Sequence, residues 1–230
     1  MANLADKKEV IKDYIRNRTM NVVNDARAYL FIRHKPDIDI DKIGIGGGNL
    51  TTALALFATL GFLAKVYKIL EKGFPYTQNE INEARDALKN CPGCSSYENL
   101  IIPRRANELN EENAFISLIR DSKVNLGIKD DELCTVWREV RNKLAHMNVP
   151  DKGNVIMTFK IMGKSYEEII DLIEKSETPP FLRNENNDLE MYADILQRDV
   201  VRISKWIAEQ IDSNQFKDDK IILALDWLSS

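Results

Sequence analysis

The apolar segment between residues 50 and 72 constrains this chain more than any other part of its sequence. Its large apolar side chains lie around most of the circumference of a helix: Leu54, Leu56, Phe57, Leu60, Phe62, Leu63, Val66, Tyr67, Ile69 and Leu70. Such a helix must be covered on every side, because its apolar surface would otherwise face water. Its dense apolar part, residues 53–64, is shorter than a bilayer span, so we expect a central core helix and no membrane contact.

Apolar residues recur at helical spacing through most of the remaining chain. The predicted helices cover approximately residues 8–35, 77–90, 110–123, 132–147, 165–175, 188–213 and 220–228. Residues 155–162 have a period of two instead, which predicts one strand. Because strands and helices do not alternate along the chain, the predicted fold class is all-α, a helical bundle with a minor extended or β element.

No change in composition divides the 230 residues into separate domains. We predict one helical domain over residues 1–230, with core helices at about 8–147 and 188–213 and an insertion or accessory segment at 150–187. The run Thr178-Pro179-Pro180 interrupts the chain, which makes residues 178–187 the best candidate for a linker.

The overall charge restricts the binding partners that this chain can attract. It has 32 Lys and Arg against 36 Asp and Glu, a formal net charge of -4, so contact with nucleic acid requires a local patch. Its 3 cysteines are too few for a disulfide framework. The residues after Met1 lack the apolar core of a signal peptide. These features favour a protein of the reducing cytoplasm.

The predicted helix over residues 132–147 carries the strongest functional pattern. Its buried stripe is predicted to hold Leu133, Val136, Trp137, Val140, Leu144 and Met147. Arg138, Asn142 and His146 follow one line outside this stripe, at a spacing of four. Arg141 and His146 are about 140° apart around an ideal helix, so one helix does not direct both at one point. We expect that two copies packed through this polar face would form a shared site with two Arg and two His.

The segment from Arg141 to His146 resembles the R-[polar]-x-x-x-H signature of HEPN domains. The resemblance implies an all-helical HEPN-like bundle and a metal-independent endoribonuclease that needs no cofactor and leaves a 2′,3′-cyclic phosphate. It also implies a homodimer with a composite active site. Many members act in toxin–antitoxin, abortive-infection or other antiviral defence systems, so an antitoxin or regulatory protein partner is expected.

The residue types suit this chemistry. RNA carries its own nucleophile, the ribose 2′-hydroxyl. We predict that His146 acts as general base or acid, because histidine as a residue type titrates near neutral pH, and that Arg141 stabilises the charged phosphate. Asn142 is placed to orient His146 or the phosphate from one turn away. Arg138 and Lys143 are candidate RNA contacts on the same helix.

Each pattern has a simpler alternative. The polar side of the helix is also consistent with a solvated face on which Glu139 pairs with Lys143. A non-catalytic HEPN-like module that binds a partner protein or a nucleotide is the alternative function. It explains the negative charge more easily. It also predicts no loss of function when His146 is changed.

Three further motifs are weaker. Cys91-Pro92-Gly93-Cys94 has the spacing of a zinc or redox pair, but a turn is favoured because few further ligands remain. The glycine-rich segment 44–49 matches no phosphate-binding fingerprint, so a flexible start to the core helix is favoured over nucleotide binding. His34 falls at the end of the first predicted helix, where a cation favours the helix dipole.

Overall fold

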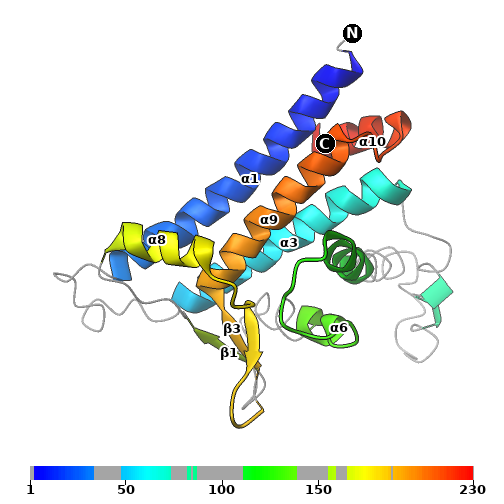
Figure 1. The fold of residues 1–230 in the computed structure, drawn as a ribbon. Coiled ribbons are helices and arrows are strands. Elements are labelled where there is room, and N and C mark those ends of the chain that lie inside the picture. The colour runs from blue at the N-terminus through cyan, green and yellow to red at the C-terminus, as the bar shows by residue number, and fades with distance from the viewer. Residues whose placement is uncertain are drawn as a thin grey trace, which may run out of the picture.

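A computed structural model gives the architecture of the chain (Figure 1). It describes residues 3–33, 48–73, 82–83, 85–86, 111–138, 155–158, 165–187 and 189–229. The helices are α1 (Leu4–Arg33), α3 (Gly48–Lys72), α6 (Leu133–Val136), α8 (Tyr166–Lys175), α9 (Ala193–Asp212) and α10 (Asp218–Ser229), with further helical turns over 111–122. Helix accounts for 77% of these residues, which confirms the predicted all-α class with a minor strand element.

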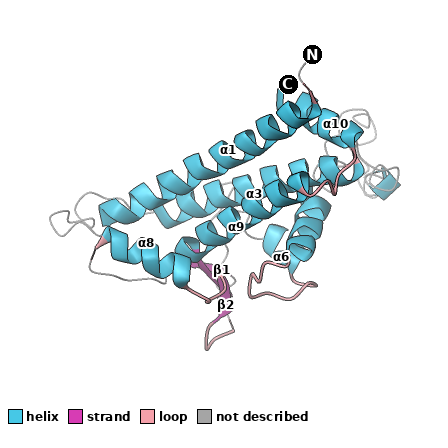
Figure 2. Cartoon of the chain, turned by 45° about the horizontal axis from the view of Figure 1, so that its top comes forward, coloured by secondary structure: helices cyan, strands magenta, loops and turns pink. Residues whose placement is uncertain are grey.

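The apolar helix α3 lies at the centre of the bundle, as predicted. It packs against α1, α9 and α10, and Figure 2 shows these helices around it. Leu56, Phe57, Leu60 and Leu63 are fully buried. Thr51–Lys72 has the length and the mean hydropathy, 1.7, of a membrane-crossing helix. Of its apolar 18-residue stretch, 67% is buried inside the protein. A buried core helix meets the same criteria, so this is weak evidence for a span.

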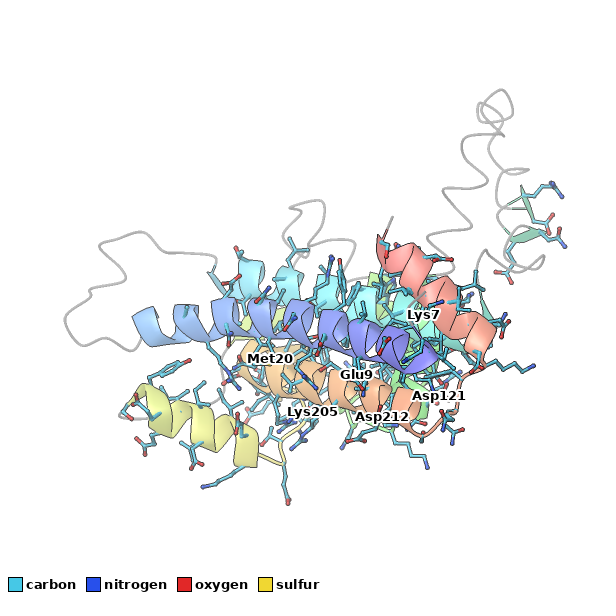
Figure 3. The ribbon with its side chains drawn as sticks, turned by 90° about the horizontal axis from the view of Figure 1, so that it is seen from above. Lys7, Glu9, Met20, Asp121, Lys205 and Asp212 are labelled. Atoms are coloured by element: carbon cyan, nitrogen blue, oxygen red, sulfur yellow. The ribbon has the colours of Figure 1, made fainter. Side chains whose placement is uncertain are left out.

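An ion pair joins α1 to α9, which run antiparallel. The Lys12 ammonium lies 2.5 Å from the Asp212 carboxylate and 2.7 Å from that of Glu9. In Figure 3, Glu9 and Asp212 lie on neighbouring turns of the two helices. The hydrogen bond to Asp212 is the main reason that the pKa of Lys12 is raised. Further along α1, Arg27 reaches Glu174 of α8 at 3.0 Å.

Three short strands form a mixed sheet beside the first turns of α9. They are β1 (Val155–Thr158), β2 (Phe181–Arg183) and β3 (Leu189–Tyr192), in the spatial order β1-β3-β2. β1 runs parallel to β3, and β2 runs antiparallel to it with Phe181 opposite Met191. β1 confirms the first half of the strand that the sequence predicts, and residues 159–162 lie outside the described part.

The helix predicted over 188–213 is wrong at its start, where the chain forms strand β3. Residues 189–192 are extended, and α9 begins only at Ala193. The physical reason is pairing on both sides, because β1 and β2 together satisfy the backbone of β3. The linker expected at 178–187 is also replaced by structure. This segment contains β2, and its Phe181 is fully buried.

Other predicted helices are confirmed where the structure describes them. Helical turns cover 111–122, and α8 begins at a capping box in which the Ser165 hydroxyl accepts a hydrogen bond from the Glu168 amide at 3.2 Å. α10 is two residues longer at its start than expected. Residues 82–83 and 85–86 of the predicted 77–90 helix are helical, and its other residues lie outside the described part.

The loop before α6 is attached to β2. The Phe181 amide donates a hydrogen bond to the Leu126 carbonyl at 3.0 Å. Gly127 has a positive φ of 81°, and a Cβ atom built there would lie 2.1 Å from the Phe181 carbonyl oxygen and 2.7 Å from Pro179. Only glycine therefore allows the loop to approach the strand so closely.

We expect Gly127→Ala to destabilise the fold by about 2–5 kcal/mol, because left-handed strain adds to overpacking against β2 backbone. Gly73→Ala is the matched control, since Gly73 also has a positive φ of 83° but its Cβ would meet only the flexible end of Lys220. Denaturant unfolding of both variants measures the difference. Equal destabilisation by the two substitutions would show that the contact with β2 contributes nothing.

Candidate functional site

The candidate site residues divide between described and undescribed parts of the chain. Arg141, Asn142, Lys143 and His146 lie outside the described residues. So do His34, Cys91, Cys94 and residues 44–47, while Gly48 is the first residue of α3. The structure describes Arg138 and the residues before it, which lead into the motif.

Trp137 fixes the segment immediately before the motif in the core. Its side chain is 2% exposed and stacks on the Phe115 ring, with ring centres 4.7 Å apart. The centre of its ring lies 6.4 Å from that of Phe57 on α3. A Cβ atom at Gly61 would lie 3.1 Å from the indole, so glycine lets α3 approach this ring. Leu133, Val136 and Trp137 are all buried, which confirms these three positions of the predicted apolar stripe.

Arg138 lies on the polar side, as predicted, and it is held by Glu112. Its guanidinium Nε and Nη2 donate hydrogen bonds of 2.7 Å to the two carboxylate oxygens. These bonds raise the pKa of Arg138. The Arg138 side chain remains 58% exposed, whereas Glu112 is 13% exposed. The pair therefore ties the segment before the motif to the helix over 111–122 and neutralises the arginine charge.

Two further arginine–carboxylate pairs surround the start of α6. The Arg183 guanidinium of β2 binds Glu132, which also accepts a hydrogen bond from the Lys129 amide at 3.1 Å. The Arg183 contact is the larger reason that the pKa of Glu132 is lowered. Arg120 pairs with Asp130 at 2.9 Å. Sequence reasoning did not identify these carboxylate partners, because Glu112, Asp130 and Glu132 have the pattern of ordinary helix starts.

A buried ion pair on α9 positions the chain between α8 and β2. The Arg198 guanidinium donates two hydrogen bonds of 2.8 Å to the Asp199 carboxylate. It also donates to the carbonyl oxygens of Ser176 and Thr178, the latter at 3.1 Å. Burial raises the pKa of Asp199, and the charges of Arg198 and Arg202 oppose that effect. These contacts fix the position of the chain just before β2. β2 in turn is hydrogen-bonded to the loop before α6.

A pocket of about 310 Å³ lies at the end of α3, beside the turn between α9 and α10. The residues that line it include Tyr67, Glu71, Phe216, Lys217 and Lys220. The Tyr67 hydroxyl donates a hydrogen bond of 2.7 Å to Asp121, and burial is the main reason that its pKa is raised. Within the described residues, no three His, Cys, Asp or Glu side chains gather as a metal site would require.

Comparisons with family models, curated proteins and solved structures find no match to this chain.

The Arg198 contacts predict a strong preference for arginine at this position. Arg198→Lys is expected to cost about 2–4 kcal/mol, because lysine cannot bind the carboxylate with two donors and also reach both carbonyls. Arg202→Lys is the matched control, since Arg202 contacts the same carboxylate at 3.4 Å but is 51% exposed. Its effect is expected to stay within about 0.5 kcal/mol. Thermal unfolding of both variants tests the prediction, which an equal loss at the two positions would contradict.

Proposed function

We propose that this chain is a HEPN-type endoribonuclease that cleaves RNA without a metal ion. The observation that carries the proposal is the segment Arg141-Asn142-Lys143-Leu144-Ala145-His146, four residues after the buried Trp137. A mostly helical bundle, and the burial of Leu133, Val136 and Trp137 at the start of the predicted motif helix, support it. The net charge of -4 leaves the binding of RNA to local groups.

The proposed reaction follows from the residue types. The ribose 2′-oxygen attacks the adjacent phosphorus and gives its proton to a histidine acting as base. The bond from phosphorus to the 5′-oxygen breaks, and that oxygen takes up a proton from a histidine acting as acid. The products are a 2′,3′-cyclic phosphate and a free 5′-hydroxyl. Arg141 stabilises the negative charge that develops on the phosphate, and Asn142 orients His146 or the phosphate.

Arg138 has a more specific role in this proposal than general attraction of RNA. Its two hydrogen bonds to Glu112 already neutralise its charge and hold the start of the motif helix. A phosphate that binds Arg138 must displace Glu112 or share the guanidinium with it. We therefore assign Arg138 a positioning role, and Lys143 remains the candidate RNA contact on this helix.

A ribonuclease of this type endangers its own cell, so we propose that it acts in the cytoplasm as a toxin or antiviral defence effector. An antitoxin or regulatory protein then controls it. The two-copy site also explains why one helix carries an arginine and a histidine that do not point in one direction.

The test is cleavage of end-labelled RNA by the purified protein in excess EDTA. We expect His146→Ala and Arg141→Ala to lower the rate by about 100-fold or more, because each removes one group that acts in the transition state. His34→Ala is the matched control, since it removes the other of the 2 histidines and is expected to cleave like the wild type. The wild-type product should end in a cyclic phosphate.

Equal cleavage by the wild type and His146→Ala would contradict the proposed active site. Cleavage that depends on added metal would contradict the proposed mechanism. If neither protein cleaves RNA, alone or with its co-encoded neighbours, the non-catalytic binding module replaces the ribonuclease as the favoured function.

A further inference from the structure

The pocket at the end of α3 has the properties of a small-molecule site. It lies where the last turns of α3 pack against α10 (Figure 1). Four parts of the chain contribute lining residues: the end of α3, the last turn of α9, the turn that follows α9, and the start of α10. Its volume of about 310 Å³ is at the lower end of the range for ligand pockets, so a small molecule fits it.

The most buried lining residues are apolar and form the floor of the pocket. Leu70 and Tyr67 are both buried. The Tyr67 ring packs against Trp206 and Phe216, with ring centres 5.3 Å and 6.0 Å apart, and its hydroxyl donates a hydrogen bond to Asp121. Because that hydroxyl is already bonded, Tyr67 offers a ligand its ring. The floor therefore suits an apolar group.

The other lining residues are polar and form the rim. Gln215 and Lys217 are exposed, and Gln210 is half-buried. Within the part of the chain that the structure describes, these three side chains make no hydrogen bond and no ion pair. Lys220 differs, because its ammonium lies 3.3 Å from the Asp219 carboxylate. One ammonium group and two amides of the rim are therefore available to a ligand.

Glu71 gives the same rim a negative charge. Burial and the hydrogen bond to Asp121 are the main reasons that the pKa of Tyr67 is raised, and the charge of Glu71 adds to them, so this carboxylate lies near the phenol. Its partner is the Lys72 ammonium at 3.5 Å, and both side chains are partly exposed. Such an exposed pair is weak, so a ligand can replace it.

The two signs of charge restrict the ligand. Lys217 and Lys220 oppose a ligand that is only a cation. Glu71 opposes one that is only an anion, and so do the exposed Asp218 and Asp219 beside the pocket. A zwitterion meets neither difficulty. Its apolar part enters the floor, while its charged groups stay at the exposed rim, where loss of water costs little.

We propose that this pocket binds a free α-amino acid with a large apolar side chain. That side chain packs on Tyr67, Leu70 and Phe216. The carboxylate binds Lys217, and the ammonium group binds Glu71. The ligand thereby joins the end of α3 to the turn between α9 and α10. None of these residues belongs to the motif from Arg141 to His146, so the proposal does not rest on the proposed function.

The first test is calorimetric titration of the full chain with L-phenylalanine and with L-leucine. We expect saturable binding. Two analogues, 3-phenylpropionate without the ammonium group and phenethylamine without the carboxylate, are expected to bind about tenfold more weakly than L-phenylalanine, because each loses its contacts at one part of the rim. No saturation by either amino acid up to about 10 mM would overturn the proposal. Binding of either analogue as tight as that of L-phenylalanine would do the same.

Variants then assign each charge, with circular dichroism to confirm that each one folds. Glu71→Gln is expected to weaken L-phenylalanine by about threefold or more and to leave 3-phenylpropionate unaffected. Lys217→Gln is expected to weaken L-phenylalanine similarly and to leave phenethylamine unaffected. Lys205→Gln is the matched control, since Lys205 is exposed on α9 and does not line the pocket. Wild-type affinity in both pocket variants, or an equal loss in the control, places the ligand elsewhere and contradicts the proposal.

Discussion

The burial of α3 is the constraint on which the other parts of the structure depend. Its apolar residues lie on every side, so the surrounding helices must cover all of it. Phe57 and Phe62 are five residues apart and face different sides of the bundle. Phe57 meets Trp137 just before the motif, and Phe62 meets Tyr14 of α1 and Trp227 of α10. One helix thus fixes the segment before the motif on one side and the packing of α1 and α10 on another.

Polar contacts then determine where the covering segments lie. Arg198 holds the chain before β2, β2 is bonded to the loop at Leu126, and Arg183 of β2 binds Glu132 at the start of α6. Arg138 finally ties the next turn to Glu112. These contacts form a continuous path from α9 to the residues immediately before the motif. Because Arg198 and Asp199 are buried, solvent and salt weaken their ion pair less than they weaken the exposed pairs further along this path.

The sequence predicts those features that depend on local pattern. The apolar circumference of α3, the capping box at Ser165 and the burial of Leu133, Val136 and Trp137 are all recognisable in short windows. It does not predict β3, because extended conformation at 189–192 depends on pairing with two strands distant in sequence. Nor does it predict the pairs Arg138–Glu112 and Arg183–Glu132, which join residues 26 and 51 positions apart. The roles of Arg141, Asn142 and His146 stay predictions.

The proposed shared site has a consequence for assembly. Because Arg141 and His146 are about 140° apart around an ideal helix, the proposal requires a two-fold contact through this segment, in which each copy supplies one side of each site. Under this proposal, the association of two copies determines whether an active site exists, so the activity would depend on protein concentration.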